Sequence, residues 1–240
     1  MRILLISFIA ISLLNCQQKQ TKTATTNIVE EQAQPGQNTP KNAPTIKVID
    51  TDFSKGRLNL QHELSLEDLE KFHGHLCDGL VVGFLGIREG LEVLYPDGII
   101  DRTNTRIVSK SSPCLTDVAV YITGGRYQFN SFYVDNAIEN AFYIIQRKDS
   151  GKTVAVRMNK GVKPKEISQL GAKAVKGELP ACDLDKLKKM ENNFSKKLLS
   201  TNPKDNFTVT EISDFKWHPI LKNDFVKTDI LNKNKAKCGR

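Results

Sequence analysis

Apolar positions at helical spacing recur along much of the chain. They predict helices over residues 65–73, 79–94, 164–176 and 184–199, and a shorter helix over residues 115–123. Ser65 is placed to cap the first helix, with the acid Asp68 three residues later. The helix is expected to end near Gly74, which puts residues 73–78 at a helix end and turn.

Alternating apolar and polar residues predict the strands. They fall at residues 105–110 and 128–134, in a hairpin of residues 141–146 and 153–158, and at residues 207–211. The hairpin turn is expected at residues 149–152. Helices that segregate around a largely antiparallel sheet, with a helical extension at the C-terminus, indicate the α+β fold class.

Four glycines stand three or four residues apart in the second predicted helix, at Gly79, Gly83, Gly86 and Gly90. Each isolated glycine costs a helix about 1 kcal/mol relative to alanine. A row of them on one face therefore predicts that another element approaches the helix closely.

The first residues have the layout of a secretory signal, with Met1 and Arg2 before an apolar run over residues 3–14. The run is shorter than the about 20 residues of a transmembrane helix. Residues 12–16 resemble the lipobox of bacterial lipoproteins, in which the cysteine, here Cys16, is lipidated with fatty acids such as palmitate and becomes the first mature residue. The alternative is a plain secretory signal. The expectation is a lipid-anchored protein exported to the bacterial cell envelope.

Composition divides the rest of the chain. Residues 17–45 are polar and rich in Gln, Thr, Asn and Pro, which predicts a disordered tether. A folded domain is expected over residues 46–180 and a basic extension over residues 181–240, where lysines accumulate in a chain of net charge +8. No aromatic residues interleave these lysines, so a nucleic-acid partner is not expected. Two interpretations of these lysines stay open: a basic face exposed to solvent, or contact with an anionic membrane surface.

The five cysteines bear on the chemistry. With Cys16 set aside, Cys77, Cys114, Cys182 and Cys238 remain, and an even number outside the cytosol allows disulfides. Whether Cys182 and Cys238 pair is open. The sequence contains no Cys-x-x-Cys, which excludes the clearest signature of a zinc ribbon or a thioredoxin-like site.

Three potential metal ligands fall within five residues, at His73, His75 and Cys77. Imidazole and thiolate suit zinc and, less selectively, iron, cobalt, nickel or copper. On a continuous helix His73 and Cys77 would share a face. If Gly74 breaks the helix, His75 and Cys77 can turn to one side as well.

Two more candidates lie at the start of the predicted helix near residue 115. Cys114 stands where the helix dipole favours a thiolate, as a ligand or as a nucleophile. Asp117 follows one turn later, and its carboxylate can orient a histidine or bind the metal itself.

These motifs resemble the FmdE family of formylmethanofuran dehydrogenase proteins. The resemblance is carried by residues 72–79 (Phe-His-Gly-His-Leu-Cys-Asp-Gly), by Gly83, by Cys114 with Asp117, and by Thr123-Gly124. It spans about residues 66 to 160, and it differs from the family where Asp78 replaces a proline and Gly125 a cysteine. It implies an α+β domain with a zinc or other transition-metal site that uses His75 and Cys77, with Cys114 beside them.

Three interpretations of the cluster remain open. The first is a metal site, the second a Cys77 to Cys114 disulfide, and the third a metal- or thiol-dependent enzyme, either a hydrolase or a redox enzyme. The absence of a substrate motif favours binding of a metal, a metallo-cofactor or a small molecule over catalysis. Association between copies of the chain is left open. An exported location argues against membership of a cytosolic methanogenic complex.

Overall fold

The computed structural model describes residues 39–50 and 60–218, all within one compact unit, residues 33–240. The predicted lipidation site Cys16, most of the predicted tether, and Cys238 lie outside the described residues. Residues 39–44 form no helix or strand, and the first strand begins at Thr45. None of the described helices combines the length and apolar character needed to cross a bilayer.

The larger sheet has five strands in the order β5-β4-β6-β7-β8. Their bounds are β4 (Thr105–Ser109), β5 (Phe132–Val134), β6 (Tyr143–Arg147), β7 (Thr153–Met158) and β8 (Phe207–Glu211). All neighbours are antiparallel except β4 and β5, which are parallel. With helices around it, this sheet confirms the α+β class.

A second sheet was not predicted. Its order is β2-β1-β3, with β1 (Thr45–Asp50), β2 (Leu60–Ser65) and β3 (Ile99–Asp101). Strand β2 is an exposed edge, and Leu64 is its one buried residue, so it shows no apolar alternation. Strand β3 has only three residues and is held by parallel pairing with β1. Neither strand has a local signal long enough to be read from sequence.

The helices of the described residues are α1 (Leu66–His73), α2 (Asp78–Leu94), α3 (Pro113–Thr123), α4 (Lys165–Val175), α5 (Ala181–Ser200) and the short α6 (Pro203–Asn206). Five of these six helices were predicted, in this order, and only the short α6 was not. The capping box forms as expected: Ser65 Oγ accepts from the Asp68 amide at 3.0 Å, and Asp68 Oδ2 accepts from the Ser65 amide at 2.9 Å. Helix α3 starts at Pro113, so Cys114 lies inside its first turn rather than before it.

The predicted strand over residues 128–134 is wrong in its first half. Tyr127–Phe129 form a 3-10 turn, and only Phe132–Val134 pair in the sheet. The cause is Asn130, whose left-handed backbone (φ 52°) breaks any extended run.

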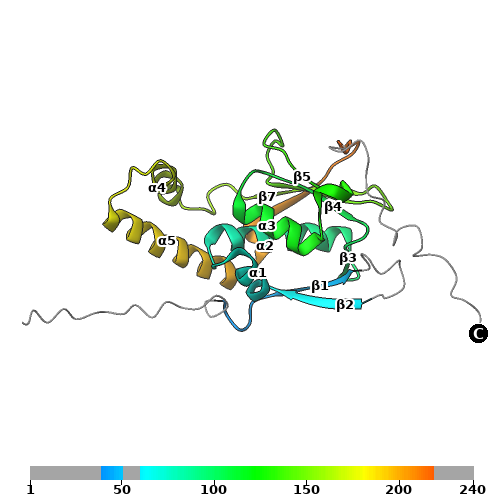
Figure 1. The fold of residues 1–240 in the computed structure, drawn as a ribbon, viewed down its shortest axis with the longest axis horizontal. Helices are drawn as coiled ribbons and strands as arrows, with labels where there is room; N and C mark the ends of the chain where they lie inside the picture. Colours follow the sequence, from blue (N-terminus) through cyan, green and yellow to red (C-terminus); the bar gives the residue numbers. More distant parts are fainter. Residues whose placement is uncertain (1–38, 51–59, 219–240) are drawn as a thin grey trace, which may run out of the picture. The chain divides into compact units, whose positions relative to one another are not determined.

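Helix α2 lies at the centre of the core. One apolar cluster joins Ile46 and Val48 of β1, Phe84 and Leu91 of α2, and Ile145 of β6. Figure 1 shows α2 and α3 between the larger sheet and strands β1 and β2.

The glycine row of α2 is explained by close neighbours, as predicted. A Cβ on Gly79 would lie 2.8 Å from Cys114 Sγ, and one on Gly90 would lie 2.7 Å from Val156. The neighbours that approach are side chains of α3 and the larger sheet. Gly79 is thus the point at which α2 lies against the chemistry-bearing start of α3.

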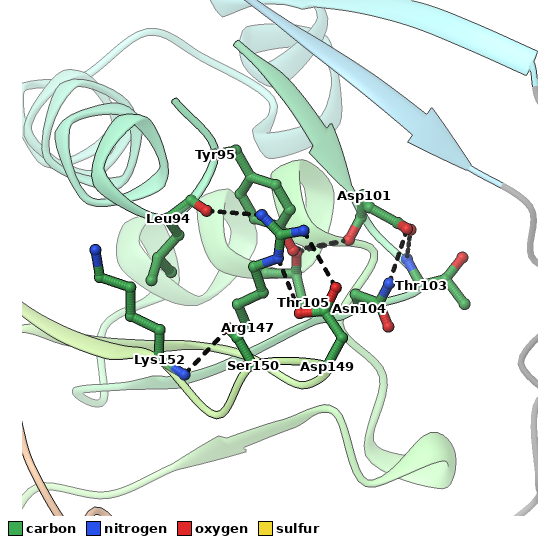
Figure 2. A network of polar contacts seen from close by, with 10 residues as sticks. All are labelled: Leu94, Tyr95, Asp101, Thr103, Asn104, Thr105, Arg147, Asp149, Ser150 and Lys152. Atoms are coloured by element: carbon green, nitrogen blue, oxygen red, sulfur yellow. Dashed lines mark hydrogen bonds and ion pairs between the residues drawn. The ribbon is translucent and has the colours of Figure 1, made fainter. Parts of the chain in front are cut away.

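A polar network closes the C-terminal end of α2 (Figure 2). The Tyr95 hydroxyl lies 2.8 Å from Thr105 Oγ1, and Arg147 donates to the Leu94 carbonyl at 3.0 Å. The Arg147 guanidinium also lies over the Tyr95 ring, 4.6 Å from its centroid, and pairs with Asp149 at 2.9 Å. The helix end is thereby fixed to both β4 and β6.

Candidate metal centre

Three helix ends meet at one place. His73 is the last residue of α1, Cys77 is the N-cap of α2, and Cys114 is the second residue of α3. Gly74 ends α1 in the left-handed conformation (φ 99°), and its amide donates to the Glu70 carbonyl at 2.8 Å. The chain then turns through His75 and Leu76, and Cys77 caps α2, which begins at Asp78.

The donor atoms of these three residues lie within 4.8 Å of one another. Cys77 Sγ is 3.4 Å from Cys114 Sγ and 3.9 Å from His73 Nε2. In a tetrahedral zinc site, bonds of about 2.0–2.3 Å put neighbouring ligand atoms about 3.5–3.8 Å apart. A disulfide would need about 2.05 Å, so the two cysteines are present as free thiols. The group could hold a metal ion.

Asp117 orients His73. Its Oδ2 lies 2.7 Å from His73 Nδ1, and since a carboxylate can only accept, Nδ1–H is the donor. In the neutral imidazole the lone pair is then on Nε2, which is the nitrogen that faces Cys77. The His73 side chain is only 7% exposed, so its ring is held in this orientation. A carboxylate behind a histidine is the usual support of a metal ligand.

The hydrogen bond between the two thiols shifts their pKa values in opposite directions. It lowers the pKa of Cys114 to about 7 and, with burial, raises the pKa of Cys77. The Leu80 amide donates to Cys77 Sγ at 3.3 Å and opposes that rise. Both sulfurs stand at helix N-termini, where the helix dipole favours a negative charge.

A charged pair and a glycine complete the surroundings. Lys163 Nζ lies 2.8 Å from Asp78 Oδ2, on a carboxylate that is 10% exposed and adjacent to Cys77. Gly79 leaves room for the Cys114 side chain, as described above. Lys163 could not be found from the sequence, because it lies 85 residues from Asp78 and no local pattern connects the two.

His75 lies outside the group formed by His73, Cys77 and Cys114. It is exposed, and its ring centroid is 4.9 Å from that of His73. Burial of part of the ring and the charges of His73 and Lys188 lower its pKa. The expected break at Gly74 is present, yet it is His73 that joins Cys77. Asp117 contacts His73 and stands outside the group of three donor atoms found among the described residues.

The fold and the site define an α+β protein with a His/Cys group suited to a metal ion. The family model described as "FmdE, Molybdenum formylmethanofuran dehydrogenase operon" matches residues 72–208, more than half of the chain. The chain therefore belongs to the FmdE family. The match starts at the Phe-His motif and extends through β8 residue Thr208, beyond the part recognised from sequence motifs. No curated protein matches the sequence.

Proposed function

We propose that this protein is a metal-binding protein of the bacterial cell envelope, in which His73, Cys77 and Cys114 hold a zinc ion. A donor set of two sulfurs and one nitrogen suits zinc better than the oxygen-preferring ions. Nickel, cobalt, iron and copper also accept these ligands, so the metal itself has to be measured. Membership of the FmdE family, whose description names the operon of a molybdenum enzyme, agrees with a metal-related role.

The observation that carries the proposal is the orientation of His73. Asp117 fixes the proton on Nδ1, and the free Nε2 faces a sulfur that already lies 3.4 Å from a second sulfur. A buried histidine with a structural role does not need its second nitrogen directed at two thiols. Within the described residues these three side chains supply three ligands, so a bound zinc would have a fourth position for water or for a ligand. Zinc there would supply a Lewis acid and would lower the pKa of bound water.

The test is metal stoichiometry. The chain from residue 17 onward retains the whole compact unit of residues 33–240. It is purified under reducing conditions without chelator, and its metals are counted by elemental mass spectrometry. We expect about one metal per chain, lost in Cys77→Ser.

Cys182→Ser is the matched control, because Cys182 is an exposed free cysteine on α5 outside the group. It should retain the metal. Metal-free wild-type protein, with Cys77 and Cys114 recovered in one disulfide-linked peptide, would contradict the metal-binding role.

The envelope location rests on the signal-like layout of residues 1–16 and on Cys16 at the lipobox position. We expect the full chain to incorporate labelled palmitate and to fractionate with membranes. Cys16→Ser should lose both properties, while Cys182→Ser keeps them. Equal labelling of the two variants would contradict lipidation at Cys16.

A second candidate function is thiol–disulfide exchange, favoured by the 3.4 Å contact between Cys77 Sγ and Cys114 Sγ. The two thiols would pass two electrons and two protons to a partner disulfide, which becomes two thiols, and would themselves form a disulfide. Added zinc should then protect both cysteines from this oxidation. If Cys77 and Cys114 are oxidised at the same rate with and without zinc, their exchange reaction does not depend on a metal bound to them.

A further inference from the structure

A cleft lies beside the loop that carries Cys77. It is formed by Leu76 of that loop, by Pro40, and by one face of α5. Its volume is about 250 Å³, below the about 300–1,000 Å³ of most ligand pockets. Any ligand that fills the cleft is therefore small. It would contact Leu76, which precedes the candidate metal ligand Cys77 in the chain.

The wall contributed by α5 is basic. Lys188 and Lys196 stand about two helical turns apart with Asn192 between them, all on the face that lines the cleft. Neither lysine belongs to an ion pair among residues 39–50 and 60–218. By contrast, Lys186 on the same helix pairs with Glu166 at 2.7 Å. The two cleft lysines thus have charge available for a ligand.

Apart from Asn192 and Ser195, the rest of the lining is apolar. Leu76 and Leu199 are half-buried and also contact the main core, and Pro40 completes the apolar part. A ligand that fills the cleft would therefore meet apolar surface at its base and two ammonium groups at its rim. Such a combination favours a molecule with one charged end and one short apolar part.

We propose that this cleft binds a small organic anion with a short apolar chain, such as a carboxylate or a phosphate monoester. The charged group lies between Lys188 and Lys196, and the apolar chain contacts Leu76 and Leu199. That the ligand lies beside a metal rests on the proposed function, whereas the cleft and its lysines do not.

The experiment is calorimetric titration of the chain from residue 17 onward with hexanoate and with hexyl phosphate. Acetate, inorganic phosphate and hexanol are the comparison ligands, because each lacks either the apolar chain or the charge. We expect saturable one-to-one binding of hexanoate or hexyl phosphate, at least about tenfold tighter than that of the comparison ligands. Which of the two binds more tightly distinguishes a carboxylate from a phosphate ligand.

The variants are matched in charge. Lys188→Gln with Lys196→Gln removes both cleft lysines, and we expect binding at least about tenfold weaker. Lys189→Gln with Lys197→Gln removes the same charge from positions turned about 100° away on α5, and should change binding by less than about twofold. Equal weakening in both pairs would overturn the proposal, because it would show general electrostatic attraction. Hexanol binding as tight as hexanoate would overturn it too.

Metal content is measured on the same samples, so the two proposals fail separately. Anion binding by wild-type protein that contains no metal would overturn the metal role and support the cleft. A full metal complement without saturable anion binding would overturn the cleft alone. Binding to phosphatidylglycerol vesicles without binding to either small anion would also overturn it, in favour of a membrane surface.

Discussion

The two ends of helix α2 are built in contrasting ways. At the C-terminal end, the Tyr95 hydroxyl contacts Thr105 of β4, and Arg147 of β6 donates to the Leu94 carbonyl (Figure 2). At the N-terminal end, Cys77 meets another thiol at 3.4 Å and an imidazole nitrogen at 3.9 Å. The first arrangement is explained by stability alone. The second gathers weak hydrogen-bonding groups that are strong metal ligands, and stability does not require it.

The largest expected effect is loss of metal on removing a thiol from the N-terminal end. Cys114→Ser should lose metal as completely as Cys77→Ser, and the double variant should be no worse than either, because the ligands act as a unit. Competition with a chromophoric chelator measures the affinities. Additive losses would show two separate weak sites and would break the contrast between the two ends.

The pH dependence is the next largest effect. Metal displaces the proton of each thiol, so affinity should rise with pH. Below pH 7 both thiols release a proton on binding, so the association constant of the metal should rise about 100-fold per pH unit. Above pH 7 it should rise only about tenfold per pH unit, because the pKa of Cys114 is lowered to about 7 and that proton is already lost. Zinc competition measured from pH 6 to 9 checks the slope, and a flat profile would contradict thiolate ligation.

Removing the Asp117 carboxylate that orients His73 should weaken metal binding without unfolding the protein. Asp117 is 36% exposed, so Asp117→Ala costs little core contact, yet it frees the His73 ring. We expect affinity about 10–100-fold lower. Asp117→Asn keeps an acceptor for Nδ1–H and should fall between that variant and the wild type. Unchanged affinity in Asp117→Ala would show that His73 is not a ligand.

A change at the C-terminal end of α2 should affect the stability of the protein and leave its metal content unchanged. Tyr95→Phe removes the contact with Thr105 and should lower the free energy of unfolding by about 1–2 kcal/mol, with metal content unchanged. Tyr127→Phe is the control, because that ring is 49% exposed. Urea denaturation of the metal-free proteins measures the difference. A loss of metal in Tyr95→Phe would show that the two ends of α2 are coupled.

The smallest effect compares two glycines. Gly171→Ala in α4 meets nothing within 4 Å and should raise the free energy of unfolding by about 0.5–1 kcal/mol. Gly79→Ala places its Cβ 2.8 Å from Cys114 Sγ, so it should show no such gain and should also weaken metal binding. Equal stabilisation of both variants, measured by urea denaturation, would show that the start of α2 has room to spare.

Local patterns were sufficient for most of the fold. The capping box at Ser65, the break at Gly74 and strand β8 follow from residues a few positions apart. Strands β2 and β3 could not be predicted, because one is an exposed edge and the other is a three-residue partner of β1. Their conformation is fixed by pairing between distant segments rather than by their own residues.

The candidate site divides in the same way. Cys114, Asp117 and the His/Cys cluster were found from residue type and spacing, and the structure brings His73, Cys77 and Cys114 together. Which histidine joins the sulfurs depends on the φ of 99° at Gly74, and the spacing of the motif fits either choice. Lys163 and Lys188 come from segments far along the chain, so only the tertiary structure shows them near the site.

The meeting of three helix ends also sets the order in which a metal can be acquired. In an unfolded chain His73 and Cys77 are near each other, but Cys114 is 37 residues from Cys77 and reaches it only when α3 lies against α2. A metal bound to both sulfurs closes the loop between Cys77 and Cys114, and this lowers the conformational entropy of the unfolded chain. Bound metal would therefore mark molecules that have finished folding and would hold α2 and α3 together afterwards.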